Sequence, residues 1–350
     1  MQEFIRIGVD LAKNSFQVHA LEREDGAAVR RKLSRAKMRE FFSRAAPCRV
    51  GMEACGSAHY WARELRAMGH AVVLIAPAYT KPYVKRGKND AADAAAICEA
   101  MSRPEMRFVP IKSADQQGML MLHKTRELLV KQRTMSVNAL RGHLSEFGLV
   151  AAKGLGLVAA KGLGRVEALI ALALEDAGLP REARDAVALL ASHLEGLSAK
   201  IDALEKTIAK TSAQNPVSRL LDTVPGVGPL IASAIAASVP DPSVFKSGRD
   251  FAAFLGLTPS QDSTGGKTKL GSITKKGNRY IRKSLVVGCT SALRVAHKYK
   301  GALAEWIAAL RAKKKSEREL AVALANKLAR ICWAILSTGE CFRREIYARA

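Results

Sequence analysis

The sequence lacks the cysteine patterns that hold metal ions or build disulfide frameworks. Its six cysteines are scattered over 350 residues, none forms a CxxC pair, and no histidine pair lies at zinc-finger spacing. We interpret them as small apolar residues of a reduced, cytoplasmic protein. No apolar run reaches about 18 residues, so no transmembrane span is expected. The N-terminus, MQEFIRIGVD, also lacks the basic-then-apolar layout of a signal peptide.

Acidic residues are scarce relative to basic ones. The chain has 56 lysines and arginines against 32 acidic residues, which gives a formal net charge of +24. A charge excess of this kind bears on binding partners rather than on fold. Nucleic acid is the expected partner, because lysine and arginine contacts to phosphates release condensed counterions. An anionic membrane surface is the alternative.

The N-terminal part of the chain alternates between β-rich apolar runs and helical stretches. Its first three apolar runs follow one another through short turns, which is typical of a strand meander. Pro77 then ends the pattern. We therefore predict an α/β domain in which helices pack on a mixed sheet. Strands are expected at 4–10, 15–21, 27–33, 48–54 and 70–76, and helices at 36–46, 57–68 and 89–101.

Two long helices are predicted in the middle of the chain. Residues 113–147 contain no proline and only two glycines, and apolar residues recur there near helical or heptad spacing. A second apolar stripe runs through 182–213. The pair indicates an antiparallel hairpin or a coiled coil with a dimer surface, or two helices packed within one chain. Between them GLVAAKGL occurs twice in succession at 148–163, which we expect to lengthen a surface loop.

After Pro216 the sequence indicates an all-helical region interrupted by one loop. Its first helical pair contains the turn PGVGP (225–229), which is typical of a helix–hairpin–helix. The backbone N–H groups of Gly226 and Gly228 would hold a DNA phosphate at a helix N-terminus, although an ordinary turn between helices also fits. Helices are expected within 220–239, at 248–256, and near 277–296, 301–312 and 316–337.

Four acidic residues stand at positions suited to a metal site. Asp10 and Glu53 end predicted strands, and Asp90 and Asp93 lie one turn apart on one face of a predicted helix. Clustered carboxylates are the hard oxygen ligands that Mg²⁺ prefers, and two such ions assist phosphoryl transfer. The order of the four acids fits an RNase H-like domain. Each acid alone also has a structural interpretation, since Asp90 and Asp93 would favour the dipole of a helix N-terminus.

The loop QDSTGGKTKLGSITKKGNRYIRK (261–283) poses a question about Ser263. Ten lysines and arginines and no acidic residue lie between Ser263 and Lys300, a density typical of phosphate binding. The sequence GGKT does not make a P-loop, because the first glycine of that motif would fall at Gln261 and no strand leads into it. The residues alone leave two roles for Ser263, a nucleophile or a turn residue in a basic surface.

Taken together and in order, these motifs resemble the insertion-sequence transposases of the IS110 family, including its IS1111 group. The resemblance is carried by GVDLAKN, VGMEACGS, KNDAADA, the PGVGP helix pair and GLTPSQDSTGGKTKLGSITKKGNRYIRKSLV. It implies a RuvC-like DEDD domain at 1–112, a helical, coiled-coil-like segment for assembly at 113–214, and a helical transposase domain at 215–350. The GLVAAKGL duplication departs from the family pattern.

The resemblance also implies roles for individual residues. Asp10, Glu53, Asp90 and Asp93 match the acids that bind Mg²⁺. Ser263 matches the serine that attacks DNA to give a covalent phosphoserine, and Thr264 beside it is a second hydroxyl. Phosphate contacts are expected from the residues of the basic loop and its helix, namely Gly265, Gly266, Lys267, Lys269, Lys275, Lys276, Arg279 and Arg282.

The family's partners follow from the same resemblance. Members recombine DNA under the guidance of a bridge RNA, and acids of one protomer face the serine of another within a dimer or a dimer of dimers. Two other functions fit the residues: a RuvC-like junction endonuclease that hydrolyses DNA with water, and a non-catalytic nucleic-acid scaffold. The four acids argue against the scaffold. The role of the Ser263 loop distinguishes the transposase from the endonuclease.

Overall fold

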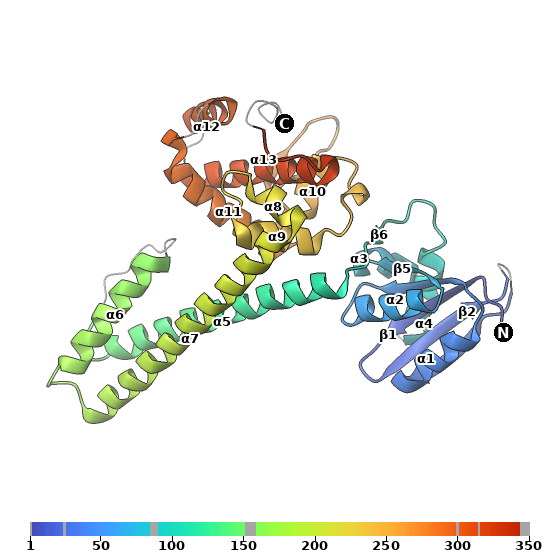
Figure 1. Ribbon diagram of the computed structural model, residues 1–350, viewed down its shortest axis with the longest axis horizontal. Coiled ribbons are helices and arrows are strands. Elements are labelled where there is room, and N and C mark those ends of the chain that lie inside the picture. Colours follow the sequence, from blue (N-terminus) through green and yellow to red (C-terminus); the bar gives the residue numbers. More distant parts are fainter. Residues whose placement is uncertain are drawn as a thin grey trace. The chain divides into compact units, whose positions relative to one another are not determined.

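A computed structural model describes residues 2–23, 26–84, 90–150, 159–298, 301–313 and 316–343 (Figure 1). The chain divides into two compact units. Unit 1 comprises Met1–Gln117 and Ala237–Val244, and unit 2 comprises Gly118–Ala236 and Phe245–Ala350.

A six-stranded mixed sheet forms the centre of unit 1, in the order β3-β2-β1-β4-β5-β6. The expected meander is present, since β1 (Arg6–Leu11), β2 (Ser15–Leu21) and β3 (Val29–Ser34) pair antiparallel in succession. On the other side of β1, the strands β4 (Arg49–Glu53) and β5 (Ala71–Ile75) run parallel to it. The short strand β6 (Phe108–Val109) closes the far edge and had no signal in the sequence.

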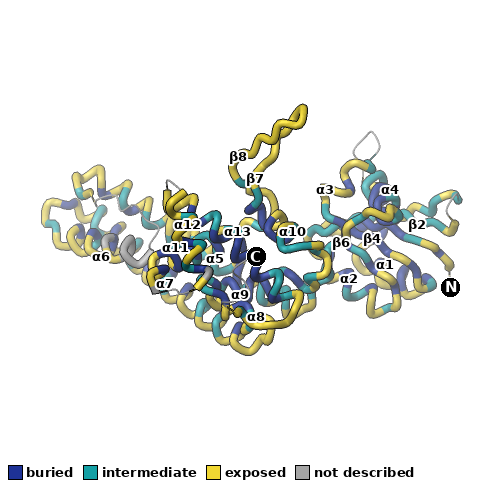
Figure 2. The backbone as a smooth tube through the Cα atoms, turned by 90° about the horizontal axis from the view of Figure 1, so that it is seen from above, coloured by how far each residue is buried: buried dark blue, intermediate teal, exposed yellow. Residues whose placement is uncertain are grey.

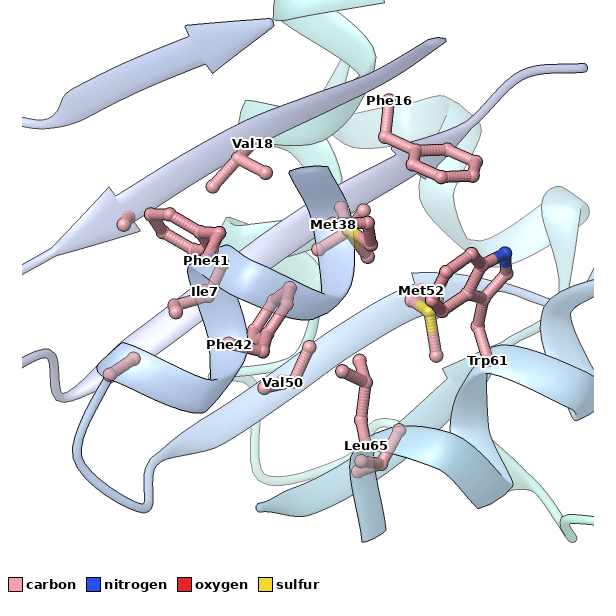
Figure 3. Packing of buried hydrophobic residues seen from close by; sticks show 14 of the residues in the cluster. Ile7, Phe16, Val18, Met38, Phe41, Phe42, Val50, Met52, Trp61 and Leu65 are labelled. Atoms are coloured by element: carbon pink, nitrogen blue, oxygen red, sulfur yellow. The ribbon is translucent and has the colours of Figure 1, made fainter. Parts of the chain in front are cut away.

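Helices cover both faces of this sheet. On one face, α1 (Arg35–Arg44) and α2 (Ala58–Ala67) pack their aromatic and aliphatic side chains on apolar residues of the inner strands (Figure 3). On the other face, α4 (Asp90–Ala100) packs against Leu21, Val73 and Ile75. We call these the α1 face and the α4 face. The links α3 (Pro77–Thr80) and η1 (Lys81–Tyr83) follow β5.

Three helices pack side by side at one end of unit 2. They are α5 (Ala114–Ser145), α6 (Ala159–Glu175) and α7 (Arg181–Gln214), and each contributes to one apolar cluster. The duplicated segment was expected to form a loop, but residues 159–163 of its second copy belong to α6. That helix extends over an apolar stripe that includes Val166 and Leu169, which favours helix over loop. Residues 151–158 of the duplication lie outside the described residues.

The rest of unit 2 is a helical bundle around α13 (Glu317–Thr338), which packs on α8 (Pro216–Asp222), α10 (Gly248–Phe254) and α11 (Arg279–Arg294). The other helices of this part of the chain are α9 (Pro229–Ser238) and α12 (Ala302–Lys313), and η3 (Ala296–Lys298) is a single 3₁₀ turn. The 3₁₀ turn η2 (Pro242–Val244) and the last two residues of α9 belong to unit 1. Among the described residues, α13 alone is long and apolar enough to cross a membrane. However, 56% of its apolar window is buried inside the protein, as in the central helix of a bundle.

The basic loop contains a β-hairpin, which the sequence did not predict. Strands β7 (Pro259–Gln261) and β8 (Leu270–Ile273) pair antiparallel and project from the helices as an exposed arm (Figure 2). At its tip, Thr264 bridges Lys267 across Gly265 and Gly266, which have φ of 58° and 75°. Positive φ at both central residues is the requirement of the tightest hairpin turn, and glycine meets it without strain. Because β7 precedes GGKT, the expectation that no strand leads into this segment is wrong, although Gln261 still stands where a P-loop needs its first glycine.

Candidate functional site

Asp10 and Glu53 lie at the same edge of the sheet because their strands run parallel. Val9 of β1 is in register with Met52 of β4, so the next residue along each strand is one of the two acids. Both carboxylates are partly buried. The carboxyl ends of adjacent parallel strands therefore present two acidic groups side by side.

The first turn of α4 adds two further carboxylates at this edge. Asp90 is exposed and Asp93 is partly buried, and one oxygen from each lies within 4.8 Å of the other and of an oxygen of Asp10. Glu53 is not part of that group of three. Its Oε2 instead accepts a hydrogen bond of 2.9 Å from Thr80 Oγ1 at the end of α3.

Glycine in β1 allows α4 to approach closely enough for this arrangement. A Cβ atom on Gly8 would lie 2.2 Å from the carbonyl oxygen of Ala94 and 2.6 Å from the backbone nitrogen of Cys98. Gly51 is its register partner in β4, and a Cβ there would lie 2.9 Å from Sδ of Met101. Two glycines side by side on the α4 face therefore let the helix lie directly on the sheet. Their role, like that of Thr80, was missed in the sequence, although GVD and GME each show a glycine two residues before the acid.

Crowding of negative charge changes the protonation of the site. The pKa of Asp10 is raised to about 6, first by burial of the carboxyl group and then by the charges of Asp93, Asp90 and Glu53. The site thus contains more negative charge than it can easily keep ionised without a counter-cation.

These residues fit a divalent cation. Three carboxylate oxygens that lie within 4.8 Å of one another form the kind of hard oxygen donor set that Mg²⁺ and Ca²⁺ take. A bound cation would also remove the repulsion that raises the pKa of Asp10. Asp10, Asp90 and Asp93 would hold the ion, with Glu53 beside them and oriented by Thr80.

Ser263 lies near the tip of the hairpin and is exposed. Its Oγ accepts hydrogen bonds from Nε2 of Gln261 at 3.0 Å and from the backbone N–H of Lys269 at 3.3 Å. The backbone N–H of Asp262 donates to the carbonyl oxygen of Lys269 at 2.9 Å and completes the pairing across the hairpin. The hydroxyl is therefore oriented by its own hairpin while its surroundings stay open to a large substrate.

The base of the hairpin is held against α10 by close backbone contacts. Gly277 has φ of +90°, and a Cβ there would lie 1.9 Å from the carbonyl oxygen of Phe254. Gly256 has φ of +68° and would similarly meet the carbonyl oxygen of Lys276 at 2.0 Å. Arg282 donates to the carbonyl oxygen of Leu255 at 2.6 Å, so this predicted phosphate contact already supports the hairpin base.

The other predicted phosphate contacts differ in their surroundings. In the turn before α9, Gly226 has φ of +83° and packs against α11, where a Cβ would lie 3.2 Å from the carbonyl oxygen of Gly288. Gly228 in the same turn is exposed. The basic arm and the start of α11 contribute five exposed cations: Lys267, Lys269, Lys275, Lys276 and Arg279.

Comparison with known proteins gives consistent matches. A family model described as "Transposase IS116/IS110/IS902 family" matches residues 218–303, and a model of the DEDD type described as "Transposase" matches residues 7–148. The chain is 48% identical to a Pseudomonas aeruginosa protein named "Probable family 20 transposase", over 97% of this chain and 98% of that protein. It is 38% identical to the transposase for insertion sequence element IS1328 of Yersinia enterocolitica, over 97% and 98% of the two chains. It is also 38% identical to the transposase for IS1111A of Coxiella burnetii, over 98% and 92%.

Proposed function

Because the chain belongs to the IS116/IS110/IS902 family of transposases, we propose that it cuts and rejoins DNA with Mg²⁺ and with Ser263 as the nucleophile. Its family membership makes it a transposase that acts on DNA and uses a divalent metal. The observation that carries the proposal is the group of three carboxylates within 4.8 Å at the sheet edge. The three carboxylates repel one another, and this repulsion favours a bound cation between them.

The carboxylates account for metal binding and for placement of the substrate. A bound Mg²⁺ would neutralise charge on the DNA phosphate. Asp10, Asp90 and Asp93 would hold the ion, and the hydrogen bond from Thr80 would keep Glu53 in one orientation beside it. Because Asp10 lies in β1 and Asp90 and Asp93 lie in α4, rigid elements rather than loops would position the ligands.

In the proposed chemical step, the hydroxyl oxygen of Ser263 attacks a DNA phosphorus atom. A bond between Oγ and phosphorus forms, and the bond from phosphorus to one deoxyribose oxygen breaks. The proton that the Ser263 hydroxyl loses passes through water to that oxygen, which leaves as a hydroxyl group. The phosphoserine ester keeps the energy of the phosphodiester, so the strand can be rejoined by the reverse reaction without a high-energy cofactor. The exposed cations of the hairpin, such as Lys267 and Lys269, would stabilise charge on the phosphate.

The proposal includes partners. A bridge RNA would select the DNA, and acids and serine from different protomers would work together in a dimer or a dimer of dimers acting on cytoplasmic DNA. The exposed side chains of Met121, Leu128 and Met135 support self-association, because they repeat every seven residues along α5. A net charge of +24 supports binding of both nucleic acids.

Trapping of a covalent intermediate tests the proposal. Purified protein is incubated with Mg²⁺, its RNA and end-labelled element DNA, and the products are separated on a denaturing gel. We expect label attached to the protein in the wild type and in Thr264→Ala, and no such label in Ser263→Ala. Thr264 is the matched control because it is the adjacent hydroxyl on the same exposed arm.

The alternative is a junction endonuclease that uses water at the carboxylates alone. This endonuclease is a real alternative because the carboxylates and Ser263 belong to different compact units, and hydrolysis by water would need the carboxylates alone. That enzyme would give free nicked ends without an adduct in every variant, and this result would exclude the serine mechanism.

A further inference from the structure

The edge strand β3 carries three consecutive cations. Arg30, Arg31 and Lys32 are all exposed. Successive side chains of a strand point to opposite faces, so Arg30 and Lys32 share one face while Arg31 lies on the other. The sheet register determines which face this is.

Arg30 and Lys32 lie on the α4 face, in the same cross-strand rows as the site. Asp10 pairs with Gln17 of β2, and Gln17 pairs with Lys32 of β3. In the next row Gly8 pairs with His19, and His19 pairs with Arg30. Neighbouring strands are about 4.8 Å apart, so the backbone of Lys32 lies about 10 Å from that of Asp10.

The helix that covers this face stops short of β3. α4 packs on β1, β2 and β4, while both cations at the edge remain exposed. Among the described residues, neither Arg30 nor Lys32 is recorded in a salt bridge, whereas Arg39 and Arg44 of α1 pair with Glu64 and Glu40. Over the residues that the structure describes, the positive charge at this edge therefore faces solvent without an ion-pair partner.

The surroundings of His19 indicate a positive electrostatic potential beside β3. His19 of β2 pairs with Arg30 of β3 and with Gly8 of β1, and within the described part of the chain its Nδ1 is buried without a hydrogen-bond partner. The pKa of His19 is lowered, first by burial and then by the charges of Arg30 and Arg6. Positive potential thus extends from the edge strand inward along the row next to Asp10.

Charged residues on an edge strand also prevent pairing with other sheets. That purpose is served by either sign and by one or two charges. β3 instead contains three cations and no acid, and it borders a group of carboxylates that would repel an anionic substrate. A polyanion would need attraction close to such a site in order to approach it.

We propose that Arg30 and Lys32 bind the phosphodiester backbone of a nucleic acid beside the carboxylates. The strand would cross the open α4 face at β3 and reach Asp10 one or two phosphates further along. This inference rests on the proposed function, because it assigns the carboxylates a nucleic-acid substrate. Contacts of this kind position the backbone and read no base sequence.

Lysine footprinting of the full chain tests the proposal. The protein is acetylated with an N-hydroxysuccinimide ester, alone and with a DNA duplex, a DNA single strand or an RNA of one arbitrary sequence, and acetylation is read by mass spectrometry. Lys37 of α1 is the matched control, because it is also exposed but lies beside the α1 face. We expect several-fold slower acetylation of Lys32 with nucleic acid and an unchanged rate at Lys37. The probe that protects Lys32 most identifies the natural ligand.

Charge-matched variants give a second measurement. Arg30→Gln with Lys32→Gln removes two charges from the α4 face, and Arg31→Gln with Lys37→Gln removes two from the α1 side. For duplex DNA, the slope of log affinity against log salt should become shallower by about 2 in the first pair and stay near wild type in the second. Equal protection of Lys32 and Lys37, or an equal change of the salt slope in both double variants, would show that only net charge determines binding. Either result would overturn the proposal.

Asp10→Asn separates this proposal from the proposed function. It should abolish DNA cleavage while leaving the protection of Lys32 in place. Cleavage by Asp10→Asn would refute the carboxylate mechanism. If nucleic acid did not slow the acetylation of Lys32 in the wild type, only the proposed phosphate contact would be refuted.

Discussion

His123 is the most deeply buried histidine of unit 2, with 1% of its surface exposed. Its Nε2 lies 3.0 Å from Oγ of Ser233, and that hydroxyl already donates its proton to the carbonyl oxygen of Pro229. Nε2 therefore donates to Ser233, and Nδ1 accepts from the hydroxyl of Tyr280 at 2.9 Å. One neutral imidazole thus joins α5, α9 and α11, the helix that follows the Ser263 arm.

This residue should make stability depend on pH. The pKa of His123 is lowered from 6.5 to about 4, by burial first and by Arg126 second. A lowered pKa means that the unfolded chain binds the proton more readily, so the contribution of neutral His123 is complete above pH 6.5 and is lost as the pH falls towards 4. The difference corresponds to about 3 kcal/mol of unfolding free energy at pH 4.

Urea unfolding at pH 7 and pH 4 measures this contribution, with His123→Gln as the control that keeps a donor but does not titrate. We expect the wild type to lose about 3 kcal/mol more than His123→Gln between the two pH values. Equal losses in both proteins would show that His123 is not the titrating group.

Single residues also show what the sequence could predict about the site. Asp10 and Glu53 could be predicted because apolar runs mark strands, and acids at strand ends gather where parallel strands end together. Asp90 and Asp93 could be predicted because a spacing of three residues places both on one face of a helix. Thr80 could not be found in this way. Its contact with Glu53 depends on the path of the chain after Pro77, which is decided by packing of α3 and not by any local pattern. The need for glycine at position 8 likewise appears only when α4 is in place.

At the scale of elements, long periodic segments were predicted well and short polar ones were not. The helices over 113–147 and 182–213 correspond to α5 and α7, because their apolar stripes extend over many turns. The hairpin was missed since β7 and β8 bury almost nothing and so show no alternation of apolar and polar residues. Its shape comes from glycines in the turn and from backbone contacts at its base.

The base of the arm makes a testable prediction through Gly277. Gly277→Ala adds a Cβ 1.9 Å from the carbonyl oxygen of Phe254 at a φ of +90°, so the arm must leave α10. We expect a loss of at least about 2 kcal/mol of stability, together with loss of the covalent DNA adduct. Thermal unfolding and hydrogen exchange of residues 259–273 measure these effects. The control is Gly265→Asn, because Gly265 also has a positive φ but a Cβ there meets open space. This variant should leave the hydrogen exchange of the arm unchanged. Unchanged hydrogen exchange in Gly277→Ala would contradict the proposed anchoring of the arm.

At the scale of the whole molecule, charge predicted a nucleic-acid partner, whereas periodicity left open whether the two long helices pair within one chain or with another copy. In the structure α5, α6 and α7 all contribute to one apolar cluster within the chain. The +24 charge agrees with membership of a DNA-acting family. How the two units act together does not follow from the sequence, because apolar periodicity describes each element only against its own neighbours. Exposed apolar surfaces of each unit therefore predict where copies of the protein associate.

The exposed stripe on α5 leads to a prediction about that assembly. Met121, Leu128 and Met135 are 70%, 53% and 60% exposed, and their seven-residue spacing places them along one side of the helix. Replacing all three by glutamate should lower the oligomeric state in multi-angle light scattering at micromolar protein, because buried charges would oppose pairing along this stripe. Leu189→Glu on α7 is the control, since Leu189 is 73% exposed but outside the stripe. The triple variant should still bind nucleic acid through its cations while forming less covalent adduct, if acids and serine come from different protomers. An unchanged oligomer in the triple variant would exclude α5 as the assembly surface.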